Sequence, residues 1–304
     1  MSRPLLTRLD LPLPWELGQV NVYLLPLDSG FLLVDCGIDS PECLAALESG
    51  LAAHNIAWRD IQIVLLTHVH PDHMGLAPEV LRRTGAALAL HPIEVAHLGD
   101  ILANNDGGLD VARTPQPLQD RIAREFADVR TAFAPLAPNI HLTDGQRLGP
   151  ATIVHTPGHS PGHVCLALDD GALLSGDHLL ENITPNIGWL PGRDTLGDFL
   201  NSLEKVAALD LATIHPAHGE PFTGHREWVR QTIAHHRERL AEIATALRLH
   251  PRTAHELVAI LWPRRLSAFH YRFAVYETLS HLEYQRRRGL AVLEPDGRWA
   301  SSSG

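Results

Sequence analysis

Four short apolar runs in this chain each end in a turn that carries histidine or aspartate. They cover residues 61–68, 151–158, 172–177 and 212–219. Apolar runs of this length, bounded by glycine, proline and aspartate, are typical of strands buried inside a sheet. Glycine adjoins the polar residue in the three later turns, where it lets the backbone approach a ligand closely. We therefore expect a polar site at the ends of buried strands.

Further strands and helices are predicted between these runs. Strands are expected at Val20–Pro26, Phe31–Gly37, Ala86–His91 and His163–Asp169, and helices at Pro41–Asn55, Gly75–Thr84, Leu118–Phe133 and Thr195–Leu209. Ser40 is a suitable N-cap for the first of these helices, with Pro41 at its first position. Strands followed by helices and then by strands again indicate an α/β (α+β) fold, in which two sheets face each other with helices outside.

Long helical patterns begin after residue 224. We expect a larger domain at residues 1–224, with a helical insertion at about 93–139, and a small C-terminal domain at residues 225–304. The small domain is predicted to contain three helices followed by two short strands around Pro295-Asp296-Gly297. Three helices and a hairpin form a winged-helix outline.

The composition excludes several classes of protein. Lys+Arg 25 against Asp+Glu 35 leaves a net charge of −10, so a surface that binds nucleic acid throughout is not expected. The three cysteines have no C-x-x-C spacing, which argues against a disulfide framework and a thiolate zinc site. No apolar stretch approaches the ~20 residues that span a bilayer, and prolines and charges interrupt the N-terminus. We expect a soluble cytoplasmic protein that contacts no membrane.

The segment Thr67–His73 carries the densest group of metal-binding side chains. Four of them lie within six residues: His68, His70, Asp72 and His73. His68 and His70 are two residues apart at a strand end, so their side chains project to the same side. The three later turns add His159, Asp177 and His218. Nitrogen and oxygen donors of this kind can hold a borderline cation.

In order and spacing, these seven residues resemble the signature of the metallo-β-lactamase superfamily over roughly residues 15–225. The resemblance implies an αββα sandwich with the site at one edge. It also implies that one metal is held by His68, His70 and His159, that the other is held by Asp72, His73 and His218, and that Asp177 bridges both. Val34-Asp35-Cys36-Gly37 matches the family's V-D-x-G turn, whose aspartate supports the site. Ala217 is a departure, because relatives commonly have glycine before the last histidine.

The complete ligand set implies two divalent metal ions. It contains no cysteine and is similar to the sets of the hydroxyacylglutathione hydrolase, lactonase and ribonuclease branches. Zinc is favoured by an imidazole-rich site, while iron and manganese stay open.

Two cations lower the pKa of a bridging water, so that hydroxide can attack a carbonyl carbon or a phosphorus. Asp72 is expected to orient this hydroxide and accept its proton, and Asp177 is the second predicted catalytic residue. His163 and His178 are further candidates to contact the ligand residues or the substrate.

Our first hypothesis for the reaction is hydrolysis of an ester, thioester or lactone of a small molecule, because Ile183, Trp189 and Leu190 are apolar candidates for a substrate wall. An endoribonuclease or phosphodiesterase that holds nucleic acid with C-terminal arginines is the alternative. These arginines are Arg264, Arg265, Arg272, Arg286, Arg287 and Arg288. We favour a packing or homodimer role for them. A non-catalytic winged-helix regulator with a vestigial metal site and a mononuclear iron dioxygenase acting on persulfides also stay open.

Overall fold

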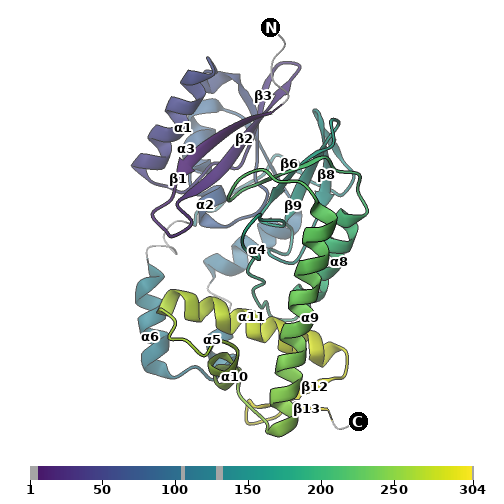
Figure 1. The fold of residues 1–304 in the computed structure, drawn as a ribbon. Coiled ribbons are helices and arrows are strands. Elements are labelled where there is room, and N and C mark those ends of the chain that lie inside the picture. Colours follow the sequence, from purple (N-terminus) through teal and green to yellow (C-terminus); the bar gives the residue numbers. More distant parts are fainter. Residues whose placement is uncertain (1–5, 104–106, 128–132, 303–304) are drawn as a thin grey trace. The chain divides into compact units, whose positions relative to one another are not determined.

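The computed structural model describes residues 6–103, 107–127 and 133–302, and its contacts divide the chain into two compact units (Figure 1). The first unit comprises Met1–Ala103, Thr131–Pro185 and Leu209–His225. The second comprises Asn104–Arg130, Asn186–Ala208 and Arg226–Gly304. Part of the predicted insertion thus belongs with the C-terminal helices. The division into two domains at residue 224 stays a prediction.

Two sheets form the framework of the first unit. The six-stranded sheet has the order β1 (Thr7–Pro12), β2 (Gln19–Leu27), β3 (Gly30–Val34), β4 (Ile61–Leu65), β5 (Ala87–Leu90) and β6 (Ile140–His141). The five-stranded sheet has the order β11 (Thr213–Pro216), β10 (Ala172–Gly176), β9 (Val164–Leu168), β8 (Ala151–His155) and β7 (Arg147–Leu148). β1, β2 and β3 are antiparallel neighbours, with Leu24 of β2 opposite Leu33 of β3, whereas β3 to β6 run parallel.

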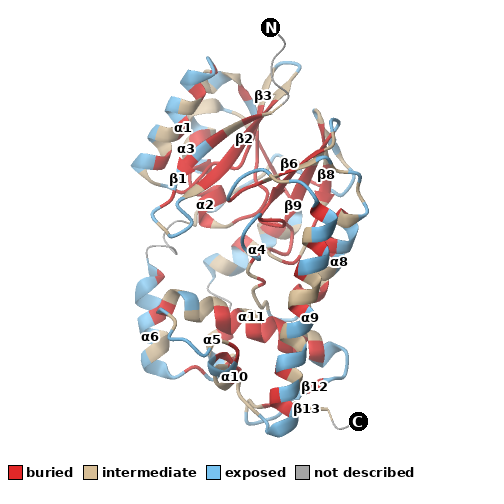
Figure 2. Ribbon diagram, in the orientation of Figure 1, coloured by how far each residue is buried: buried red, intermediate tan, exposed pale blue. Residues whose placement is uncertain are grey.

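A hydrophobic cluster has members from both sheets, and the strands that contribute them are largely buried (Figure 2). Fully buried members include Leu25, Leu32 and Leu65 of the first sheet and Ile153, Leu166 and Val164 of the second. Burying one such side chain contributes roughly 1.5–3 kcal/mol relative to leaving it exposed. The predicted arrangement of two facing sheets in a mixed α/β fold is confirmed.

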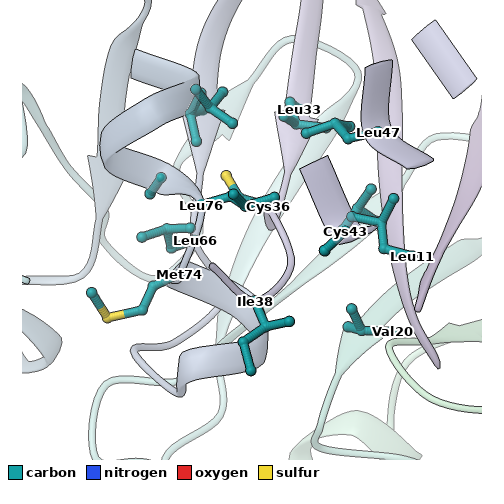
Figure 3. Close-up of a cluster of buried hydrophobic side chains, with 14 of the residues drawn as sticks. Leu11, Val20, Leu33, Cys36, Ile38, Cys43, Leu47, Leu66, Met74 and Leu76 are labelled. Atoms are coloured by element: carbon teal, nitrogen blue, oxygen red, sulfur yellow. The ribbon is translucent and has the colours of Figure 1, made fainter. Parts of the chain in front are cut away.

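Helices cover the other face of the six-stranded sheet. They are α1 (Pro41–Ala53), the short α2 (Pro71–Met74), α3 (Ala77–Thr84) and α4 (Pro92–Leu102), with a single 3₁₀ turn at Trp58–Asp60. α1 begins as predicted, because the Ser40 hydroxyl accepts the backbone N–H of Cys43 and Pro41 occupies the first helical position. Its buried residues Cys43 and Leu47 share a cluster with Leu11 (Figure 3).

The second unit is mainly helical. Its elements are α5 (Gly108–Val111), α6 (Gln116–Glu125), α8 (Thr195–Ala207), α9 (His225–Leu249), α10 (Ala254–Leu261), α11 (Ala268–Arg287), β12 (Ala291–Leu293) and β13 (Trp299–Ser301). Ile243, Leu279 and Trp299 are buried in one cluster of this unit. The three helices and the hairpin appear in the predicted order. A winged-helix role for them stays a prediction.

Several short elements were not predicted, of which β1 and α4 are the longest, and the helix predicted at Leu118–Phe133 was too long. β1 pairs with β2 and buries Leu9 and Leu11, although prolines and charges flank them. α4 begins at Pro92 and occupies the start of the predicted helical insertion, where no individual helix was assigned. α6 ends at Glu125 rather than Phe133, and residues 128–132 lie outside the described residues.

Two predictions from composition can be compared with the structure. The cysteines Cys36, Cys43 and Cys165 are all buried and form no disulfide. Among the residues that the structure describes, no helix combines the length and the apolar character needed to cross a membrane.

Candidate metal centre

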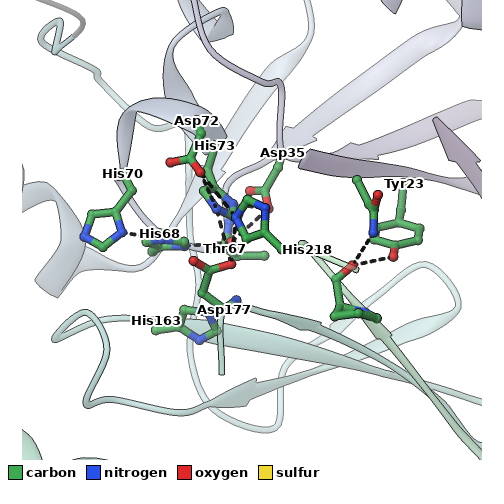
Figure 4. A network of polar contacts seen from close by, with 12 residues as sticks. Tyr23, Asp35, Thr67, His68, His70, Asp72, His73, His163, Asp177 and His218 are labelled. Atoms are coloured by element: carbon green, nitrogen blue, oxygen red, sulfur yellow. Dashed lines mark hydrogen bonds and ion pairs between the residues drawn. The ribbon is translucent and has the colours of Figure 1, made fainter. Parts of the chain in front are cut away.

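All seven predicted ligand residues come together in the first unit. Figure 4 shows six of them, all but His159. Their donor atoms form two groups, and within each group the atoms lie within 4.8 Å of one another. The first group contains His68, His70, His159 and Asp177, and the second contains Asp72, His73 and His218. This is the grouping that the sequence resemblance implied, so the structure brings together every residue we expected at the site.

The end of β4 and the start of α2 position the first histidines. His70 is the N-cap of α2 and Pro71 its first residue, and the His70 carbonyl accepts the backbone N–H of His73 at 3.0 Å. His70 Nδ1 lies 2.9 Å from His68 Nε2 and 3.0 Å from His159 Nε2. Three ring nitrogens therefore converge on one point, although His159 lies 89 residues from His70 along the chain.

Asp177 follows β10 and faces both groups. Its Oδ2 lies 3.4 Å from His159 Nε2, whereas its Oδ1 lies 3.4 Å from His73 Nε2 and 3.4 Å from His218 Nε2. The preceding Gly176 has a φ of +50°, and a Cβ there would lie 2.7 Å from His163 Nε2. Glycine is thus required at this position, and the orientation of Asp177 is that of a carboxylate shared by two sites.

Three buried nitrogen and oxygen atoms of the site indicate whether a metal would fit there. His73 Nε2, Asp177 Oδ1 and His218 Nε2 have no hydrogen-bond partner among the described residues, although they lie close together. Leaving one buried polar atom unsatisfied costs about 1–3 kcal/mol. Imidazole and carboxylate donors suit zinc and other transition metals, so a bound cation would satisfy all three atoms at once. The residues present fit a metal centre.

The pKa values differ between the two groups. Burial, and then the neighbouring imidazoles, hold the pKa of His68 well below its usual value. Burial also lowers the pKa of His73, but the nearby carboxylates of Asp35, Asp177 and Asp72 outweigh it and raise this pKa well above normal. Burial alone would raise the pKa of Asp177, whereas His218 and His73 bring it well below normal. His68 is therefore a neutral imidazole, while the ionised carboxylates of Asp72 and Asp177 beside the second group favour a positive charge there.

Asp35 supports the second group, in agreement with its place in the V-D-x-G turn. Its carboxylate accepts the backbone N–H of Thr67 at 2.8 Å and the Nδ1–H of His73 at 2.8 Å. Once the ring has lost its second proton, this bond keeps the remaining proton on Nδ1 and leaves Nε2 as the nitrogen that can bind a cation. Asp35 itself has a φ of +62°, a conformation that aspartate and asparagine tolerate better than most residues.

The position of His218 depends on polar residues that the sequence analysis did not single out. His218 Nδ1 donates to the backbone carbonyl of Gln19 at 2.9 Å. Asn21 donates to the carbonyls of Pro216 at 2.9 Å and Gly219 at 2.8 Å. A buried asparagine inside an otherwise apolar strand was the signal that could have identified this contact. The departure at Ala217 is accommodated, because its backbone still pairs with Gly176 and Asn21.

His163 lies directly beneath the site. It is buried, its Nδ1 lies 2.9 Å from the Thr156 hydroxyl, and its Nε2 accepts the backbone N–H of Asp177 at 3.2 Å. Burial is the largest cause that brings the pKa of His163 well below normal, so a neutral ring accepts this bond. His178 is also buried, with its ring 6.2 Å from that of His163. His163 thus holds the backbone of Asp177, while His178 packs next to His163.

Comparison with known proteins identifies the family. The family model described as the metallo-beta-lactamase superfamily matches residues 15–218. The chain belongs to the metallo-beta-lactamase superfamily. A second model, described as a metallo-beta-lactamase-like C-terminal domain, matches residues 240–299. The C-terminal region is therefore a domain found together with this fold.

Several superfamily proteins match the chain along nearly its whole length. A metallo-beta-lactamase family protein of Thermus thermophilus is 33% identical, with a TM-score of 0.79 and coverage of 98% of this chain and 99% of that one. A beta-lactamase domain protein of Burkholderia ambifaria is 29% identical, with a TM-score of 0.86 and coverage of 99% and 93%. "Probable metallo-hydrolase YqjP" of Bacillus subtilis is 28% identical over 94% of this chain and 91% of its own length. The chain is a metal-dependent hydrolase of this fold.

The names of two further matches state a reaction or a bound metal. The atrochrysone carboxyl ACP thioesterase of Aspergillus fumigatus is 28% identical over 67% of this chain, which spans 38% of that protein. The crystal structure of TTHA1623 in a di-iron-bound form is 28% identical, with a TM-score of 0.53 and coverage of 72% of this chain and 96% of that one.

Proposed function

We propose that this hydrolase binds two divalent cations and cleaves an ester, thioester or lactone of a small molecule. The position of Asp177 carries this proposal, since its two oxygens face two separate groups of donor atoms. His68, His70 and His159 would hold one ion, Asp72, His73 and His218 would hold the other, and Asp177 would contact both. Bound cations supply a Lewis acid and lower the pKa of a coordinated water.

Asp72 is our candidate to orient and deprotonate the attacking water. Its Oδ2 lies 3.3 Å from His218 Nε2 and 3.8 Å from His73 Nε2. Burial would raise its pKa, but His73 and His218 bring that pKa below normal, so the carboxylate is ionised and able to accept a proton. A carboxylate within hydrogen-bond reach of a water is suited to general-base catalysis.

The C-terminal arginines support a small molecule as substrate rather than nucleic acid. Arg286 and Arg287 both pair with Glu283, at 2.7 Å, and Arg288 pairs with Asp194 at 2.8 Å. Cations already paired with carboxylates have less charge to offer to phosphates. The relative named as a thioesterase supports cleavage of an acyl bond, and thioesters are therefore the first substrates to test.

The substrate wall predicted from Ile183, Trp189 and Leu190 stays a prediction. Ile183 is 45% exposed, whereas Trp189 packs against the hydrophobic cluster of the second unit. For the metal, we propose zinc first because imidazole predominates in the site. Iron is the leading alternative, since a relative with this fold has been crystallised in a di-iron form.

A metal-loaded activity screen tests the proposed function. The protein is purified, its metals are quantified by mass spectrometry, and it is assayed against thioesters, lactones, phosphodiesters and RNA. We expect two ions per chain and hydrolysis of thioesters or lactones that a chelator abolishes and Zn²⁺ restores. His159→Ala and His218→Ala should each remove activity, while His250→Ala, at an exposed position, should not.

Other outcomes of the same screen would contradict the proposal. Metal-dependent RNA cleavage with strongly salt-dependent binding, and no cleavage of acyl substrates, would favour the endoribonuclease alternative. A protein that holds no transition metal and binds DNA with a sequence preference would favour the regulator.

A further inference from the structure

A buried carboxylate outside the metal centre connects two of its loops. Glu94, in the first turn of α4, is fully buried. Its Oε2 accepts the backbone N–H of Val69 at 3.0 Å, and its Oε1 accepts the Ser160 hydroxyl at 2.5 Å and the backbone N–H of Gly162 at 2.6 Å. Burying an ionised carboxylate is costly unless donors surround it, and here three donors do so.

These partners lie beside ligands of the first metal group. Val69 stands between His68 and His70, and Ser160 directly follows His159. Val69 and Ser160 lie 25 and 66 residues from Glu94 along the chain, so one side chain fixes two distant segments. None of these contacts has a role in the chemistry proposed above.

The first turn of α4 fits tightly against the second loop. A Cβ on Gly162 would lie 2.8 Å from the backbone nitrogen of Glu94 and 3.0 Å from His91 Nδ1, so only glycine permits this approach. His91, the N-cap of α4, stacks on His155 with ring centroids 4.2 Å apart. The helix start therefore has little freedom to shift, and Glu94 is held against both loops.

We propose that Glu94 is a positioning residue for the metal ion of the first group. By holding the His68–His70 turn and the His159 loop at a fixed separation, it sets where His68 Nε2, His70 Nδ1 and His159 Nε2 converge. The proposal rests on the metal centre of the proposed function, but not on which substrate the enzyme cleaves. Residues that orient metal ligands typically change metal affinity 10- to 100-fold when substituted.

The substitution Glu94→Gln isolates this role because it keeps the shape of the side chain. The amide oxygen can replace only one carboxylate oxygen, and the amide NH₂ then faces either the Val69 N–H or the Gly162 N–H. Where the amide NH₂ faces a backbone N–H, two donors meet and no hydrogen bond forms. The side chain then no longer joins the two loops. Asp100→Asn is the matched control, since it makes the same chemical change at an exposed position of the same helix.

The experiment titrates Zn²⁺ into metal-free protein against a chelator of known affinity, and repeats the titration with Co²⁺ while recording its visible absorption. In the parent protein we expect two binding steps, and His218→Ala identifies the step of the second group. In Glu94→Gln the affinity of the first-group step should fall about 10- to 100-fold, and the Co²⁺ spectrum of this step should change. The affinity of the second-group step should stay within about twofold of the parent. Asp100→Asn should match the parent.

Three results would overturn the proposal: both steps unchanged in Glu94→Gln, both weakened equally together with a lower melting temperature, or no metal binding by the parent. The last result would also remove the metal centre itself, whereas the first two would leave it intact. If Glu94→Gln does not fold, Ser160→Ala decides the question, because it removes one bond and keeps the carboxylate. A weaker first-group step in Ser160→Ala supports the proposal, and an unchanged one contradicts it.

Discussion

The Nδ1 atom of His73 lies 2.8 Å from Oδ2 of Asp35, and both side chains are buried. Because Nδ1 donates to this carboxylate, Nε2 is turned toward Asp177 and Asp72, at 3.4 Å and 3.8 Å. The backbone N–H of Thr67 donates to the other oxygen of Asp35 and holds the carboxylate in place. A residue that binds no metal thus decides which nitrogen of His73 is available to one.

Asp35→Asn should lower the affinity of the second group for its metal ion. Asparagine tolerates the positive φ of this position, so the backbone is expected to stay the same. The amide cannot accept from both His73 and Thr67 as the carboxylate does, so the ring of His73 loses its fixed orientation. We expect about 10- to 100-fold weaker binding of one Zn²⁺, measured by chelator competition. Asp39→Asn, exposed in the same segment, should bind both ions like the parent.

Metal binding should stabilise the protein through Asp177. A ligand that binds only the folded state at 100 times its dissociation constant adds about 2.7 kcal/mol to the free energy of unfolding. Zn²⁺ should therefore raise the melting temperature of chelator-treated protein, measured by differential scanning calorimetry. Asp177→Ala should lose most of this increase, because both groups of donors share its carboxylate. An equal increase in the parent and in Asp177→Ala would show that Zn²⁺ binds elsewhere.

The stability of the second unit should decrease in acid because of His281. Burial is the main cause that lowers the pKa of His281 to about 4, and its Nδ1 donates to the Glu277 carbonyl at 2.7 Å. In the unfolded chain a histidine pKa is about 6.5, so the unfolded state binds more protons between pH 6.5 and 4. The stability from the neutral ring is present above pH 6.5 and is lost as the pH falls toward 4.

At pH 5 this single group should lower the free energy of unfolding by about 2 kcal/mol relative to pH 7. Urea denaturation of the parent and of His281→Gln at both pH values measures the difference. The variant should be less dependent on pH by this amount, whereas His54→Gln, on the surface, should behave like the parent. An identical pH dependence in the parent and in His281→Gln would exclude His281 as the cause.

Thr253→Ala should destabilise the second unit by about 1 kcal/mol. Thr253 caps α10, because its hydroxyl accepts the backbone N–H of Glu256 at 3.1 Å and the Glu256 carboxylate accepts the backbone N–H of Thr253 at 2.8 Å. Thr245→Ala, exposed in the interior of α9, is the matched control and should cost nothing or stabilise slightly. Chemical denaturation of both variants provides the comparison, and equal stabilities would contradict a role for the cap.

Local patterns in the sequence accounted for most of the longer elements and singled out all seven candidate ligand residues that the structure brings together. The strand ending at Leu65 and the helix beginning at Pro41 could be predicted, because apolar periodicity and capping residues act over a few positions. β1 was missed because its hydrophobic alternation is short and prolines flank it. α4 was missed because its start at His91 and Pro92 was assigned to the preceding strand and the insertion.

The amino-acid sequence by itself determined which donors are available and which turns carry them, since residue type and spacing are local properties. Only the tertiary structure decided that one oxygen of Asp177 faces His159 while the other faces His73 and His218. It also decided that Glu94 joins two loops. These relationships arise because sheet pairing and core packing bring together distant segments, such as those of His70 and His159, which lie 89 residues apart. Hydrogen bonds then fix each ring and carboxylate in one orientation.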